Sequence, residues 1–195
     1  MQLFLSRRFF PLFLSQVSGI VIDNLYRTCF VVFLYYLNTH ADMSKEVINS
    51  LNSFSTALLV LPYFIFSSIA GDICDKYSKS TLVSYVKMCE LAIVAFGAYG
   101  LLNGNTTCML TTLFLLGTHT TFLSPLKLSL LPEYLKDDEL IAGNAYIEIG
   151  TFAAILAGEI FANLLLIPAW GNTIIIGSLF TLSLTGLIAS FYLLP

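Results

Sequence analysis

Charged side chains are scarce in this sequence. Asp, Glu, Lys and Arg make up only 11% of its 195 residues, whereas hydrophobic residues make up 57%. A soluble domain carries about a quarter charged residues, so this composition excludes an ordinary soluble domain. The net charge is only −3, and the few basic residues form no basic patch. We therefore expect no nucleic-acid partner.

Residue types that bind metals or form cross-links are also few. The chain has two histidines and four cysteines, and no two cysteines have C-x-x-C spacing. We therefore expect neither a metal site nor disulfides. The sequence also has no nucleophile elbow and no phosphate-binding glycine loop. For these reasons we expect no cofactor and no enzymatic activity.

Long apolar runs, in contrast, are abundant. Runs of about 20 or more residues match the length that a helix needs to cross roughly 30 Å of hydrocarbon. Barrel strands would be about half as long and would alternate in polarity. The sequence therefore predicts one all-α membrane domain over residues 1–195. Its six expected spans are approximately 9–37, 48–70, 80–102, 107–132, 139–168 and 172–194.

Basic residues are distributed unevenly between the predicted loops. Six spans place the N-terminus and the loops after the second and fourth spans on one side of the membrane. The basic residues on that side are Arg7, Arg8, Lys76, Lys79 and Lys136. The opposite side has only Lys45. Because basic loops tend to stay in the cytoplasm, both termini are predicted to be cytoplasmic.

The first span contains polar residues that are costly in a membrane. Gln16, Asp23, Asn24 and Arg27 form a polar stripe along it. Asp23 and Arg27 are four residues apart, hence on one helix face and within reach of each other. An ionised group at the membrane centre costs about 2.5 to 3.5 kcal/mol. We expect the stripe to line a cavity and to serve substrate binding or coupling, with a purely structural ion pair as the alternative.

The fifth span has two neighbouring stripes. The polar stripe consists of Asn144, Glu148, Thr151 and Glu159, and the small-residue stripe of Gly150, Ala154 and Gly158. A small-xxx-small stripe lets another helix approach closely. For Glu148, a substrate or coupling role and a structural role both remain open. Glu159 is expected near the outer interface.

Other polar residues within the spans are interpreted as structural. Lys87 and Glu90 are three residues apart in the third span, and Lys127 follows an expected kink at Pro125. Lysine side chains can extend along apolar surface to reach an interface. His119, flanked by threonines, is expected to have its hydrogen bonds satisfied.

The segment "GDICDKYSKS", residues 71–80, concentrates charges between the second and third spans. Gly71 is expected to give a tight exit from the second span. The segment resembles the signature of the major facilitator superfamily between its second and third helices. Gly71, Asp75, Lys76 and Lys79 match that signature, and Asp72 adds a further charge. Ser78 and Ser80 depart from it. The resemblance implies that this segment forms a cytoplasmic gate, locked mainly by Asp75.

A broader resemblance covers most of the chain. Four blocks resemble the bacterial lysophospholipid transporter branch of that superfamily: "DNLYR", "GDICDKYSKS", "GTHTTFLSPLKLSLLPE" and "LIAGNAYIEIGTFAAILAG". This branch includes membrane halves fused to acyltransferase and acyl-acyl-carrier-protein synthetase domains. The resemblance implies a bacterial inner-membrane location, lysophospholipid as substrate, and an acyltransferase or synthetase as a further partner. It also implies that Asp23 occupies the polar position of helix one.

Superfamily members have twelve spans in two halves, with the substrate held between the halves. The six spans expected here resemble an N-terminal half, as a fragment, a split gene product or a unit that pairs. We expect a missing C-terminal half or a second copy to complete it, and no transport by this chain alone. One alternative is a proton-coupled carrier of a small solute or drug, with Asp23 or Glu148 as the proton site. Another is a non-transporting fragment, or an anchor for an acyltransferase.

Overall fold

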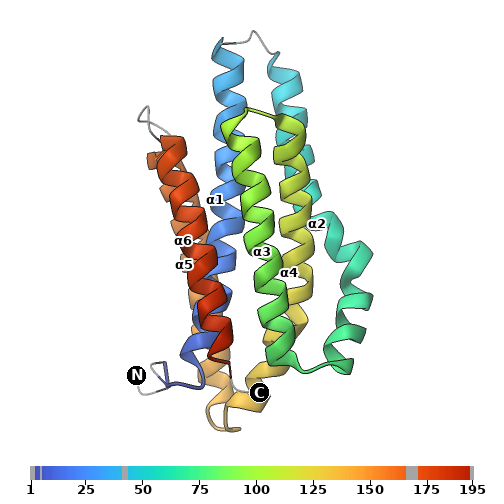
Figure 1. Ribbon diagram of the computed structural model, residues 1–195, viewed down its shortest axis with the longest axis vertical. Coiled ribbons are helices and arrows are strands. Elements are labelled where there is room, and N and C mark those ends of the chain that lie inside the picture. The colour runs from blue at the N-terminus through green and yellow to red at the C-terminus, as the bar shows by residue number, and fades with distance from the viewer. Residues whose placement is uncertain (1–2, 5, 41–43, 166–170, 194–195) are drawn as a thin grey trace.

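The protein folds as a bundle of long helices (Figure 1). The computed structural model describes residues 3–4, 6–40, 44–165 and 171–193, and within these residues it has six helices and no strand. The helices are α1 (Phe10–His40), α2 (Lys45–Lys76), α3 (Lys79–Leu102), α4 (Thr106–Tyr134), α5 (Leu140–Leu165) and α6 (Gly171–Phe191). Each one corresponds to one predicted span. Residues 166–168 and 194 of the last two predicted spans lie outside the described residues.

Among the described residues, five helices are long and apolar enough to cross a membrane. The chain is therefore a multi-pass membrane protein. α4 is not among the five. Its sequence carries many threonines, together with His119 and Lys127. α2 and α3 both pack against α4, so much of this polarity is covered by protein.

The second predicted span is longer in the structure, and its exit differs from the prediction. α2 continues to Lys76, so only Tyr77 and Ser78 connect it to α3. Gly71 lies inside the helix, and the predicted tight exit at this glycine is wrong. No proline follows Gly71 before the end of α2, and an interior glycine costs only about 1 kcal/mol, so the helix can continue. Residues 71–76 of the charged segment therefore belong to the end of α2 rather than to a loop.

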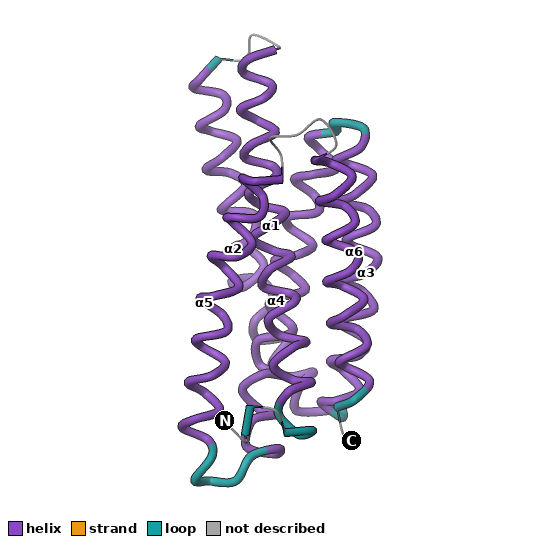
Figure 2. Tube along the Cα trace, turned by 90° about the vertical axis from the view of Figure 1, so that its left-hand side faces the viewer, coloured by secondary structure: helices purple, strands orange, loops and turns teal. Residues whose placement is uncertain are grey.

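The helices pack in two groups of three. α1 packs against α5 and α6, whereas α4 packs against α2 and α3, and contacts between α3 and α6 join the groups. Figure 2 shows the helices running side by side along the length of the bundle. The predicted small-residue stripe of α5 is confirmed as a packing surface. A Cβ added at Gly158 would lie 2.9 Å from the Val21 carbonyl oxygen of α1, and Ala154 is buried.

Both ends of the described chain lie at one end of the bundle, where α2 connects to α3 and α4 to α5 (Figure 1). This arrangement agrees with an even number of crossings. The interior has two apolar clusters. One contains Ile22 and Phe30 of α1, and the other contains Phe9 and Leu12 near its start. The intervening turns of α1 bury polar residues, Ser15, Gln16 and Ser18.

Candidate functional site

Asp23 connects α1 to α4. Its Oδ2 accepts a hydrogen bond from the Thr120 hydroxyl at 2.6 Å. Its other oxygen, Oδ1, is buried and has no hydrogen-bond partner among the described residues. Because an unsatisfied carboxylate oxygen inside a protein is costly, this atom is positioned to accept a bond from a ligand or water.

Arg27 connects α1 to α5. Its Nη2 donates to Glu159 Oε1 at 3.0 Å, with side-chain exposures of 29% and 39%. The expected pairing of Asp23 with Arg27 is therefore wrong among the described contacts. The two residues do share a helix face, but each turns towards a different neighbouring helix. Gly158 brings α5 close to α1, and this close packing places Glu159 beside Arg27.

Glu159 is a site residue that the sequence reasoning assigned to the outer interface. The sequence signal for a site role of Glu159 is its position on the same polar stripe as Glu148. With Arg27 it lines a polar cleft of about 330 Å³ between α1, α2 and α5. Asn52 and Asn163 also line this cleft.

Lys127 and Glu148 form a third polar contact, between α4 and α5. Lys127 Nζ lies 3.4 Å from Glu148 Oε1, and the Glu148 side chain is 58% exposed. Sequence reasoning treated the two residues separately, because nothing in their spacing relates one span to another. The candidate Asn24 is not part of these contacts, since its amide donates to the Ile20 carbonyl of its own helix at 2.8 Å.

The structure also brings Lys87, Glu90 and His119 together in one buried cluster, which the sequence analysis did not expect. Lys87 Nζ lies 2.9 and 3.1 Å from the two carboxylate oxygens of Glu90, and both side chains are 0% exposed. His119 Nε2 is 3.5 Å from Glu90 Oε1. The expectation that Lys87 reaches an interface is wrong, because Gly19 of α1 leaves room for the pair inside the bundle. The expectation that the hydrogen bonds of His119 are satisfied is also wrong, because neither ring nitrogen has a hydrogen-bond partner among the described residues.

The predicted gate residues lie at the end of the bundle that holds the termini. Lys79, at the start of α3, forms an ion pair with Glu133 near the end of α4. Asp72, Asp75 and Lys76 are exposed and form no hydrogen bond or ion pair within the described part of the chain. The end of α2 thus leaves three charged side chains available for a partner.

Within the described residues, no group of three or more His, Cys, Asp or Glu side chains could hold a metal ion. The candidate site instead consists of two ion pairs and one hydrogen-bonded carboxyl group, contributed by α1, α4 and α5. Arg27 and Lys127 supply positive charge, Glu148 and Glu159 supply negative charge, and Asp23 supplies the carboxyl group. Groups of both signs can bind an ionic or zwitterionic ligand.

Comparison with known proteins found sequence similarity to a transporter. Over 106 residues the chain is 30% identical to Lysophospholipid transporter LplT of Pectobacterium carotovorum subsp. carotovorum (strain PC1). The chain is similar to a transporter. The matched residues are 54% of this chain but only 25% of the relative. No family model matches the chain, and no solved structure matches it.

This similarity supports a transporter-like relation and agrees with the expected absence of enzymatic activity. It spans about a quarter of the relative's length. The relative's whole activity and its substrate are therefore only proposals for this chain.

Proposed function

We propose that the chain is one six-helix half of a major facilitator type transporter that moves lysophospholipids across a bacterial inner membrane. Two observations support this proposal: the similarity to a lysophospholipid transporter, and the three polar contacts that join α1, α4 and α5. All six helices cross the membrane in this proposal. α4 has 29 residues and at 1.5 Å per residue spans about 43 Å.

The charges of the site fit the head group of such a lipid. A phosphodiester carries one negative charge, and an arginine guanidinium can bind it with two parallel hydrogen bonds. Arg27 supplies that guanidinium on α1, and Lys127 supplies a second cation on α4. When the head group also carries an ammonium, Asp23 or Glu148 supplies the complementary charge.

The exposure of these charges supports the proposal of a half. Glu148 lies on α5, a helix apolar enough to cross a membrane, yet 58% of its side chain is exposed. Hydrocarbon cannot solvate such a carboxylate, so a water-filled cavity or another protein surface must cover it. In a two-half carrier the second half supplies that surface, and the substrate binds between the halves. A C-terminal half or a second copy would fill this role, and a cytoplasmic acyltransferase would take up the delivered lipid.

A transport assay in cells that make the protein tests the function directly. Deleting the gene should reduce uptake of acyl-labelled lysophospholipid and leave uptake of sugars and drugs unchanged. Re-expressing the wild-type gene should restore uptake, whereas the gene with Asp23→Asn should restore less than about a tenth of it, because the buried carboxyl group is lost. Asp137→Asn removes the same charge from an exposed loop and serves as the matched control. Full uptake by Asp23→Asn at wild-type protein level would contradict this role.

We further propose that Asp75 stabilises the state closed to the cytoplasm, by pairing across the boundary between halves. Asp75→Ala should then make the central site more accessible from the cytoplasm. Cysteine accessibility at a site residue, with Asp72→Ala for comparison, measures this change. An unchanged accessibility in Asp75→Ala would mean that these charges only set topology.

A further inference from the structure

A second surface of α1 lies opposite its polar stripe. At 3.6 residues per turn, Leu14, Val21 and Leu25 are centred about 160° around the helix from Gln16, Asp23 and Arg27. Whatever covers the polar stripe therefore does not cover this second surface. Leu14 and Val21 are partly exposed on it, whereas Leu25 is buried.

The apolar surface of α1 forms the floor of two hollows beside α6. The first hollow, of about 820 Å³, lies between the start of α1 and the end of α6. The second, of about 520 Å³, lies between α1, α5 and the first half of α6. They follow each other along one face of α6, because Thr181 lines the second hollow and Thr185, one turn later, lines the first. We call these two hollows together the α1/α6 groove.

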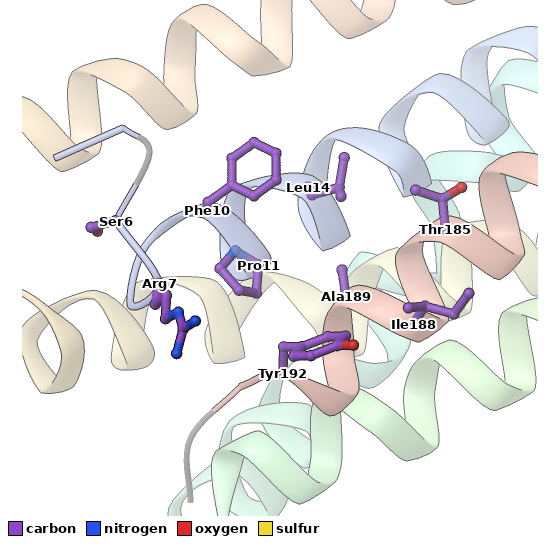
Figure 3. A pocket seen from close by; sticks show the side chains of 9 residues that line it. All are labelled: Ser6, Arg7, Phe10, Pro11, Leu14, Thr185, Ile188, Ala189 and Tyr192. Carbon is purple, nitrogen blue, oxygen red and sulfur yellow. The ribbon is translucent and has the colours of Figure 1, made fainter. Parts of the chain in front are cut away.

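One end of the α1/α6 groove carries a charge. Figure 3 shows the side chains that line the first hollow, with Arg7 just before the start of α1 and Tyr192 just after the end of α6. Arg7 is exposed and has no hydrogen-bond or ion-pair partner within the described part of the chain. Tyr192, whose ring also lines this hollow, is 70% exposed. Arginine and tyrosine are typical of the membrane interface, where lipid phosphates lie.

We infer that the α1/α6 groove binds an anionic phospholipid of the surrounding bilayer, with its phosphate at Arg7 and its acyl chains along α6. The mostly apolar lining of the groove suits acyl chains, and the single cation at its end suits the phosphate. This site is separate from the charged site between α1, α4 and α5. It does not depend on the substrate proposed above.

A lipid explains the groove better than a protein partner does. A second half or second copy is needed over the exposed charges of Arg27, Glu148 and Glu159, on the other side of α1. The groove itself contains no charge besides Arg7 among its lining residues. Open space around Gly177, where an added Cβ would meet no atom within 4 Å, lets an acyl chain lie against α6.

Photo-crosslinking in bilayers of known composition tests the inference. The full chain is reconstituted in vesicles of phosphatidylethanolamine and phosphatidylglycerol, with a trace of phosphatidylglycerol that carries a photoreactive acyl chain. Adducts should map to the start of α1 and to the face of α6 with Ile174, Thr181 and Ile188. Arg7→Gln should reduce them about tenfold, since a charge-assisted bond is lost. Gly177→Trp should remove the adducts of the second hollow only.

Arg8→Gln is the matched control, because Arg8 is also exposed but does not line the first hollow. It should leave the adducts unchanged, and circular dichroism should show equal helicity for all variants. Three results would overturn the inference. The first is an unchanged yield of adducts in Arg7→Gln. The second is protection of the groove by a second copy in a crosslinked dimer. The third is displacement of the adducts by excess lysophospholipid, which would make the groove a transport route.

Discussion

At the scale of residues, the buried pair of Lys87 and Glu90 is the most demanding feature of the bundle. Each charge is fully shielded from solvent, so each depends on the other for solvation. A buried ion pair need not stabilise a fold relative to apolar residues, but removing only one partner leaves a bare charge. The pair therefore restricts which single substitutions the core can accept.

Lys87→Met should destabilise the protein by about 3 to 5 kcal/mol, because Glu90 is left buried without its counter-charge. The double variant Lys87→Met/Glu90→Met should recover most of that loss, since no charge remains. Denaturant or thermal unfolding in detergent, analysed as a double-mutant cycle, measures both effects. A double variant as unstable as the sum of the single variants would show that the pair is not coupled as the structure indicates.

The residues of the site show where sequence reasoning ends. Spacing placed Asp23, Asn24 and Arg27 on one stripe, but it could not say that Asp23 turns to Thr120 and Arg27 to Glu159. Those choices depend on which helices pack against α1. The same reason explains why Lys127 and Glu148 were not paired from the sequence, and why Lys87 was expected at an interface.

At the scale of helices, glycine sets the closest approach. A Cβ added at Gly117 of α4 would lie 3.0 Å from the Leu59 Cα of α2 and closer still to its carbonyl oxygen. A backbone cannot move aside as a flexible side chain can, so α2 and α4 would have to separate. A Cβ added at Gly177 of α6, in contrast, would meet no atom within 4 Å.

Gly117→Ala should therefore destabilise the bundle by about 1 to 3 kcal/mol through overpacking. Gly177→Ala should be neutral or stabilise it by up to about 1 kcal/mol, because alanine favours the helix. Comparing the unfolding midpoints of the two variants in one detergent separates packing from propensity. Equal midpoints would mean that α2 and α4 do not approach as closely as described.

Helix positions were predictable from the sequence, because apolar runs of membrane length are a strong local signal. The end of α2 was not, since Gly71 suggested an exit where the helix continues to Lys76. For α4 the sequence predicts a span over about 107–132, and the crossing of the membrane by this helix stays a prediction. Its polarity is covered by α2 and α3, and that cover is visible only once the helices are assembled.

At the scale of the whole molecule, the decisive question is whether α4 crosses the membrane. Asn103 and Asp137 lie just before and just after α4, and both are exposed. If α4 crosses, these positions face opposite sides, and Tyr77 shares a side with Asp137. The distribution of basic residues further predicts that Tyr77 and Asp137 face the cytoplasm.

Single cysteines at the three positions, with the four native cysteines replaced, can be labelled with an impermeant maleimide in intact cells. Asn103→Cys should be labelled from outside, and Tyr77→Cys and Asp137→Cys only after the membrane is opened. Labelling of Asn103→Cys and Asp137→Cys from the same side would mean that α4 does not cross, and the proposed six-helix half would then fail.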